Sequence, residues 1–213
     1  MGKIRKGILG GFSGTVGTVV GANWRGIAYM RSLPQKVKNP KTLGQRTQRN
    51  KFAVTLAFLQ PLTGFLRVGW KLYAYKRTPF NAAMSYTIAN AITGTYPNFT
   101  IDASQVLVSR GALSPASNAN ASPTPGGNIS ITWQNNSGST TANEDDKALI
   151  AIINQNKGEA VFDTAGTRRD STNQNMTMPM SWVGEQVNVY LGFISADEKQ
   201  VSNSVYLGQI TVS

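Results

Sequence analysis

The side chains that most often carry out chemistry in proteins are scarce in this sequence. Histidine and cysteine are both absent, which excludes zinc fingers, iron–sulfur clusters, disulfides, cysteine nucleophiles and histidine-based acid–base catalysis. Catalysis would have to rely on carboxylate pairs, Ser–Lys pairs or tyrosine, and no motif of these kinds occurs. We therefore expect a protein that is not an enzyme and that has no cofactor, no metal site and no small-molecule substrate.

Two local patterns resemble ligand sites but lack residues that such sites require. The acidic run Asn143-Glu144-Asp145-Asp146 lacks the alternating acids, the central glycine and the closing glutamate of an EF-hand calcium loop. The glycine-rich stretch GGFSGTVGT at 10–18 lacks the Gly-Lys-Ser/Thr ending of a P-loop. We interpret the acidic run as a polar loop between strands, and we expect no nucleotide site in the glycine-rich stretch.

Charge is divided very unevenly along the chain. The first 101 residues contain 15 of the 21 Lys and Arg residues and no Asp or Glu, and the first acid is Asp102. A folded segment without carboxylates cannot neutralise its own electric field. The N-terminal half is therefore expected to bind something anionic outside it.

The basic residues are concentrated around Asn39-Pro40-Lys41-Thr42, just before an expected helix. Thr42 can cap that helix, and cations at a helix N-terminus are unfavourable unless an anion is present. We predict contact with phosphate, an acidic polymer or an acidic neighbour; a solvated basic surface is the alternative. The expected contact residues are Lys36, Lys38, Lys41, Arg46, Arg49 and Lys51.

The N-terminus imitates a signal peptide, with basic residues followed by a Gly/Val stretch. Glycine, serine and threonine interrupt the part that would have to be apolar, so we expect no cleaved signal. No apolar run reaches the roughly 18 residues that a membrane span requires. We expect synthesis in the cytoplasm, with incorporation into a virion or release left open.

The elements that position these residues change in type along the chain. Residues 1–32 are typical of glycine-punctuated strands that pack against a neighbour, such as another copy; a mobile arm is the alternative. Apolar spacing predicts helices within 41–60 and 62–77, separated by a proline, and a third helix over 78–93 that ends at Gly94.

Residues after about 96 have the texture of short strands joined by polar turns. The expected strands are 100–109, 128–134, 147–154, 159–163, 175–180, 186–194 and 204–212, and 114–127 is expected to be a loop. This pattern is typical of a β-sandwich. We predict an α+β protein with a basic strand and helical module at 1–96 and a sandwich domain at 97–213.

The C-terminal strands resemble an antiparallel fibronectin type III or immunoglobulin-like sandwich. Trp133 ends an alternating ISITW strand, as the core tryptophan of that fold does, and Tyr190 lies where such folds place a packed tyrosine. The absence of cysteine favours the fibronectin-like variety. The resemblance implies two facing antiparallel sheets.

The chain as a whole is similar to a family of uncharacterised proteins of comparable length from Bacteroidota. The similarity is carried by GILGGFSGTVGTVVG at 7–21, by 24–32, by 38–42 and by SNSVYLG at 202–208. Asn39-Pro40-Lys41-Thr42, followed by Gln45, Gln48 and Arg49 and then by Trp70, gives residues 10–75 a looser resemblance to small structural proteins of tailed phages and prophages. The first resemblance implies no activity, and the second implies a virion component.

Together these observations predict a structural or assembly subunit, present in multiple copies, that contacts itself or a larger particle such as a phage-like virion or an extracellular filament. A basic front half and an acidic loop suit head-to-tail contacts. The expected self-assembly residues are Phe12, Val16, Val19, Trp24, Arg25, Tyr29, Arg31, Glu144, Asp145 and Asp146. The rival is nonspecific nucleic-acid binding, because cations alternate with aromatic residues in the first half.

Overall fold

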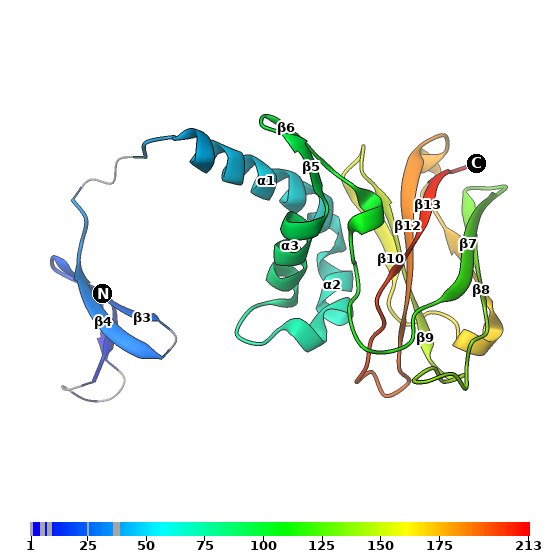
Figure 1. Ribbon diagram of the computed structural model, residues 1–213, viewed down its shortest axis with the longest axis horizontal. Helices are drawn as coiled ribbons and strands as arrows, with labels where there is room; N and C mark the ends of the chain where they lie inside the picture. The colour runs from blue at the N-terminus through cyan, green and yellow to red at the C-terminus, as the bar shows by residue number, and fades with distance from the viewer. Residues whose placement is uncertain (1, 5–6, 8–9, 25, 36–38) are drawn as a thin grey trace. The chain divides into compact units, whose positions relative to one another are not determined.

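The computed structural model describes residues 2–4, 7, 10–24, 26–35 and 39–213 (Figure 1). The expected anion-contact residues Lys36 and Lys38 and the expected self-assembly residue Arg25 lie outside the described residues. The chain divides into two compact units, Met1–Thr42 and Leu43–Ser213. They are called unit 1 and unit 2 below.

Unit 1 is a four-stranded antiparallel sheet in the order β1-β2-β3-β4. Its strands are β1 (Lys3–Ile4), β2 (Phe12–Val16), β3 (Val19–Trp24) and β4 (Ile27–Ser32). Glycine density here reflects close approach within the unit: a Cβ on Gly21 would lie 2.2 Å from the Phe12 carbonyl oxygen and 2.6 Å from its ring. Only glycine lets Phe12 lie directly against β3.

Unit 2 begins with three helices, α1 (Leu43–Leu59), α2 (Thr63–Gly69) and α3 (Pro79–Asn90). Pro61 lies in the 3₁₀ turn η1 (Gln60–Leu62) between the first two, as the sequence predicts. Thr78 caps α3, because its hydroxyl accepts a 3.1 Å hydrogen bond from the Asn81 amide.

The end of α3 differs from the expectation. The helix stops at Asn90, and Gly94 lies in a hairpin formed by β5 (Ile92–Thr95) and β6 (Asn98–Ile101). Gly94 has a φ of 86°, and a Cβ there would lie 2.4 Å from the Asn98 carbonyl oxygen. The glycine therefore permits the hairpin and does not terminate the helix.

The rest of unit 2 contains two antiparallel sheets. A three-stranded sheet in the order β11-β8-β7 contains β7 (Ser117–Thr124), β8 (Asn128–Gln134) and β11 (Asn173–Thr177). A four-stranded sheet in the order β10-β9-β12-β13 contains β9 (Lys147–Asn154), β10 (Glu159–Asp163), β12 (Gln186–Ile194) and β13 (Val205–Thr211). The chain is thus α+β with mainly antiparallel sheets.

The first strand of these sheets is not the expected one. Beyond Ile101, the expected strand 100–109 forms the 3₁₀ turn η3 (Ala103–Gln105) and an irregular segment, whereas β7 lies inside the expected loop 114–127. Val106 and Val108 are buried although their segment is irregular. Strand β7 escapes detection because its core-facing residues are small alanines among Asn and Ser.

Three layers result, with helices on one face of the four-stranded sheet and the three-stranded sheet on the other (Figure 1). Strand β9 shows why: Ala151 and Ile153 join the helical cluster, whereas Ile150 and Ile152 join the cluster between the sheets. A strand buried on both faces requires the uninterrupted apolar run that β9 has. Trp133 and Tyr190 are buried as expected.

The boundary between the compact units lies at 42/43, whereas the sequence suggests 96/97. The reason is that Leu59, Leu62 and Phe65 of the helical layer belong to one buried cluster with β9 and β12. The change from basic to mixed charge near Asp102 therefore falls inside a compact unit.

Segment Leu43–Gly69 is the one helical stretch in the described chain that is long and apolar enough to cross a membrane by length and composition. It is not a straight helix, because η1 separates α1 from α2. Its side chains Leu59, Phe65 and Leu66 are buried in the helical cluster. Core packing accounts for these apolar side chains, whereas Leu43 and Phe52 of the same segment are exposed.

Candidate interaction surfaces

Over the residues that the structure describes, one face of the unit 1 sheet carries no charged side chain, and we call it the charge-free face. Strand alternation and register place every second residue of each strand on it. Its residues are Ile4, Phe12, Gly14, Val16, Val19, Gly21, Asn23, Ala28, Met30 and Ser32.

Large apolar side chains on the charge-free face are exposed. Met30 is 70% exposed, Ile4 57% and Val16 56%. With Phe12 and Val19 they line a shallow hollow of about 360 Å³. An exposed apolar patch of this kind typically marks an interaction site.

The opposite face carries the charges of the sheet, Lys3 and Arg31, together with the exposed Trp24, Ile27 and Tyr29. The expected self-assembly residues therefore divide between the two faces. Phe12, Val16 and Val19 lie on the charge-free face, and the other described members of unit 1, Trp24, Tyr29 and Arg31, lie on the opposite face.

The expected anion-contact residues are mostly exposed. Lys41, Arg46 and Arg49 are exposed around the start of α1, whose first turn contains no acid. Lys51 differs, because it is half-buried and its ammonium group lies 5.1 Å from the centre of the Phe99 ring. A cation held over an aromatic face is less available to an outside anion.

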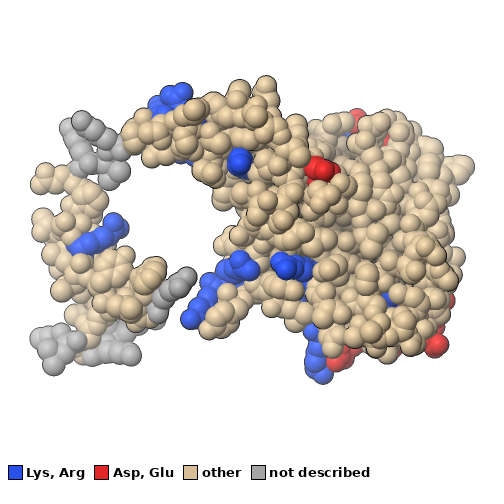
Figure 2. Space-filling view, in the orientation of Figure 1, with Lys and Arg blue, Asp and Glu red and all other residues tan. Residues whose placement is uncertain are grey.

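Figure 2 shows Lys and Arg gathered over the helical part of unit 2 and most of the visible Asp and Glu over the sheets. The helices contribute Arg46, Arg49, Lys51 and Arg67, and the segment between α2 and α3 contributes Lys71, Lys76 and Arg77. Unit 2 therefore has a basic helical layer and a more acidic sheet region.

Several aromatic residues that alternate with these cations are structural. Trp70 is buried and Tyr73 packs against it with ring centres 5.7 Å apart. The Arg110 guanidinium lies 4.6 Å from the Tyr73 ring and 5.4 Å from the Tyr86 ring. In contrast, Tyr75 is 80% exposed. Base stacking on the buried Trp70 is thereby ruled out.

The acidic loop between β8 and β9 is only partly free to bind a partner. Glu144 and Asp145 are exposed, but Asp146 is fully buried and accepts a 3.1 Å ion-pair hydrogen bond from Nε of Arg169. Its Oδ2 atom also accepts from the Asn143 amide at 2.9 Å. The expectation that Asp146 contacts another copy is therefore wrong, because this carboxylate neutralises a buried arginine.

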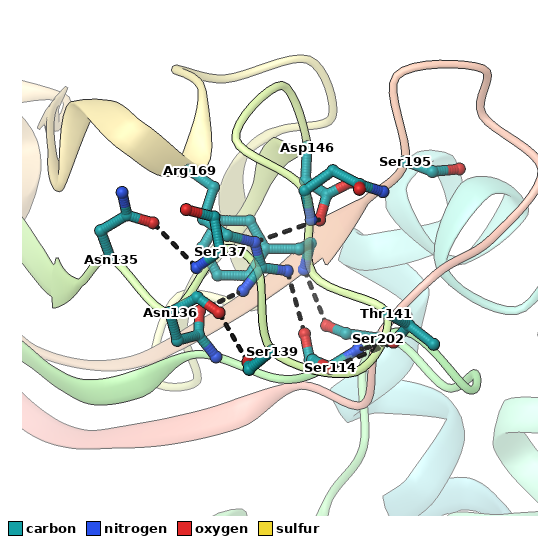
Figure 3. A network of polar contacts seen from close by, with 12 residues as sticks. Ser114, Asn135, Asn136, Ser137, Ser139, Thr141, Asp146, Arg169, Ser195 and Ser202 are labelled. Atoms are coloured by element: carbon teal, nitrogen blue, oxygen red, sulfur yellow. Dashed lines mark hydrogen bonds and ion pairs between the residues drawn. The ribbon is translucent and has the colours of Figure 1, made fainter.

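Arg169 is the centre of a polar network at this end of the sheets (Figure 3). Its guanidinium donates to the Asn136 side chain at 2.6 Å and to the Ser114 carbonyl at 3.0 Å, and it lies 3.8 Å from the centre of the Phe193 ring. Burial lowers the pKa of Arg169, and Asp146 opposes this. Its neighbours Arg168 and Asp170 form an exposed ion pair at 3.2 Å.

A second loop, between β12 and β13, lies beside the acidic loop. Asp145 from one loop and Asp197 from the other line a shared hollow of about 400 Å³. The Ser195 hydroxyl donates to Asp197 at 2.6 Å, and with the Lys199 amide it holds the pKa of Asp197 well below its usual range. Among the described residues, no group of three or more His, Cys, Asp or Glu could hold a metal ion.

Comparison with known proteins places the chain in a family of unknown function. Among solved structures, the fn3 domain of the human collagen alpha-1(XX) chain is similar at 12% identity, with a TM-score of 0.36, over 48% of this chain and 89% of that domain. No curated protein matches the chain. A family model matches residues 11–208, almost the whole sequence, and the chain therefore belongs to the family of unknown function DUF6266.

Proposed function

We propose that this protein is a non-enzymatic assembly subunit that attaches through unit 1 to copies of itself or to a larger particle. The observation that carries the proposal is the charge-free face, where Ile4, Val16 and Met30 are exposed together.

A sheet of this size cannot be stable in water while its apolar side chains stay exposed. Every residue of β4 is exposed, so the described part of unit 1 does not bury this strand. Burying one large aliphatic side chain contributes about 1.5–3 kcal/mol, and small sheets need a covering layer to persist. A partner that covers the charge-free face would supply this burial.

The distribution of charge in unit 1 also favours the charge-free face as the contact surface. Residues 1–42 contain eight Lys and Arg and no acid, so two copies repel each other wherever their cations meet. The two described cations of the sheet, Lys3 and Arg31, project from the opposite side, so a contact through the charge-free face keeps them apart. A phage-like virion and an extracellular filament are the kinds of assembly to which the proposal extends.

We also propose that the two facing sheets of unit 2 form a fibronectin type III-like sandwich. The support is the strand order, with three strands in the order β11-β8-β7 facing four in the order β10-β9-β12-β13. Such a domain serves as a scaffold, and function has to be argued from its surfaces.

The test is light scattering of the full chain with a paired substitution. Val16→Asp with Met30→Asp places two charges on the charge-free face, and Ser13→Asp with Thr15→Asp places two on the opposite face. We expect the first variant to self-associate at least about tenfold more weakly, a loss of about 1.4 kcal/mol. Equal behaviour of the two variants would refute the role of the face.

Nucleic-acid binding is the second candidate, and the basic helical layer favours it. The exposed Tyr75 beside Lys76 and Arg77 offers one stacking position. Retention on single-stranded DNA at low salt, with a linear fall of log affinity against log salt, would support this candidate. The absence of retention at low salt would exclude it.

A further inference from the structure

One end of unit 2 carries an exposed basic projection, the segment between α2 and α3, which we call the cationic tip. Tyr75 is 80% exposed and Leu72 50% exposed, and Lys76 and Arg77 are exposed beside them. The Lys76 ammonium lies 5.1 Å from the centre of the Tyr75 ring. The tip therefore combines apolar area with positive charge.

The same end carries the two loops that enclose the hollow described above. Exposed acids project from both: Glu144 and Asp145 from the β8–β9 loop, and Asp197 and Glu198 from the β12–β13 loop. We call these four residues the acidic loops. The buried Arg169–Asp146 pair fixes the first loop from inside, so its exposed acids are held in position.

The cationic tip and the acidic loops are neighbours. The Lys71 ammonium, at the base of the tip, donates to the backbone carbonyl of Glu198. Both patches therefore belong to one surface of one compact unit.

Within the described chain most charges of the two patches are unpaired; the exception is Asp197, which forms a 3.0 Å ion pair with Lys199 of its own loop. Arg77 uses its Nε to donate to the Tyr73 carbonyl at 3.2 Å, and over the residues that the structure describes no carboxylate pairs with Lys76 or Arg77. Glu144 and Asp145 likewise take part in none of the ion pairs of the described chain.

We propose that this surface is a two-fold contact between two copies of the chain, in which the cationic tip of each copy lies on the acidic loops of the other. A surface that carries both signs side by side is self-complementary under a two-fold rotation, because each half supplies what the other half needs. Tyr75 and Leu72 then become buried at the contact, and the hollow beside Asp145 is available to receive them.

Charge also argues against a polyanion as the occupant. A nucleic acid or an anionic membrane that approached Lys76 and Arg77 would meet the exposed Glu198 on the same surface. A second copy rotated by 180° instead meets opposite charge at both positions. This inference rests on the proposed assembly function but uses a different surface from the charge-free face.

The experiment uses the full chain carrying Val16→Asp and Met30→Asp, so that association through the charge-free face is weakened in every sample. Three double variants are made in this background. Lys76→Glu with Arg77→Glu reverses the tip, Glu144→Lys with Asp145→Lys reverses the β8–β9 part of the acidic loops, and Arg46→Glu with Arg67→Glu is the control of equal charge change elsewhere on the helices.

We expect analytical ultracentrifugation to show a dimer of the background chain that weakens with added salt. Each reversed variant alone should associate at least about tenfold more weakly, and the control should match the background. An equimolar mixture of the two reversed variants should regain the dimer, because both contacts of the mixed pair then join opposite charges.

Two outcomes overturn the inference. If the background chain stays monomeric up to about 1 mM, unit 2 makes no such contact, while the proposed function can still hold through unit 1. If the mixture associates no better than its two components, the charges are not paired across a two-fold contact.

Discussion

Both units contain a four-stranded antiparallel sheet, yet the two sheets stand in opposite relations to water. In β9 of unit 2 seven of eight residues are buried, whereas all six residues of β4 in unit 1 are exposed. The sheet of unit 2 has a covering layer on each face, whereas the charge-free face of the unit 1 sheet leaves Ile4 and Met30 exposed. Hydrogen-bonded pairing alone therefore does not make a stable sheet, because apolar burial supplies most of the free energy.

The largest loss of stability should follow from a substitution at the buried ion pair of unit 2. Asp146→Ala removes the partner of Arg169 and leaves a buried, uncompensated guanidinium. We expect the free energy of unfolding of unit 2 to fall by about 3–5 kcal/mol, measured by urea titration with tryptophan fluorescence.

The matched control is Asp170→Ala, which removes the partner of the exposed Arg168. Exposed pairs contribute about 0–1 kcal/mol, so the control should scarcely change the titration. Equal losses in the two variants would mean that the network around Arg169 does not hold this end of the sheets together.

A pair of identical substitutions tests the comparison between the sheets directly. Ile152 in β9 is fully buried and Ile27 in β4 is 62% exposed. Ile152→Ala should cost about 2–5 kcal/mol of unfolding free energy because it leaves a cavity. Ile27→Ala should stay within about 0.5 kcal/mol in the same urea titration. A large effect of Ile27→Ala on the dilute chain would show that unit 1 has a core of its own.

The sequence predicted best the elements whose own residues carry the signal. The uninterrupted apolar run of β9 and the Thr78 cap of α3 depend on adjacent residues, and both are found in the structure. Strand β7 was missed because its core-facing residues, Ala119 and Ala121, are too small to give an alternating pattern.

The candidate sites were harder to predict, because exposure depends on residues distant in the chain. Arg169 and Asp146 are 23 positions apart, and nothing local distinguishes this buried pair from the exposed Arg168–Asp170 pair beside it. Similarly, Trp70 and Tyr75 look alike in a basic aromatic stretch, but one is buried and the other exposed. Only the packing of α2 and α3 separates them.

A smaller effect is expected from a substitution in unit 1 that should weaken self-association without changing the stability of unit 2. Gly21→Ala places a Cβ 2.2 Å from the Phe12 carbonyl oxygen and so displaces Phe12 from the charge-free face. We expect self-association by light scattering to weaken about tenfold, or about 1.4 kcal/mol, with no change in the unfolding midpoint of unit 2.

The control for this substitution is Gly44→Ala in α1, where an added Cβ meets nothing within 4 Å. In a helix, alanine is more favourable than glycine by about 1 kcal/mol at most. Because the substitution adds no clash and lies outside the charge-free face, this variant should associate normally. If Gly21→Ala also associates normally, the position of Phe12 has no part in assembly.

The smallest effect concerns a buried hydroxyl in β12. Tyr190 is fully buried and its hydroxyl donates to the Ala103 carbonyl at 2.7 Å. Tyr190→Phe should therefore cost about 1 kcal/mol of unfolding free energy at neutral pH. Tyr29→Phe, at an exposed position of β4, should leave the urea titration unchanged.

The same residue gives a pH dependence of known sign. Burial, with smaller contributions from Tyr206 and Asp102, raises the pKa of Tyr190 far above its ordinary value. The folded state then holds its proton more tightly than the unfolded chain, so this stabilisation is complete below the unfolded pKa of about 10 and is lost as the pH rises above it. Urea titrations from about pH 8 to about pH 11 should show a steeper loss for the natural chain than for Tyr190→Phe. Parallel curves would mean that water reaches Tyr190, and that the contrast between the buried sheet and the exposed one is weaker than the packing of β12 indicates.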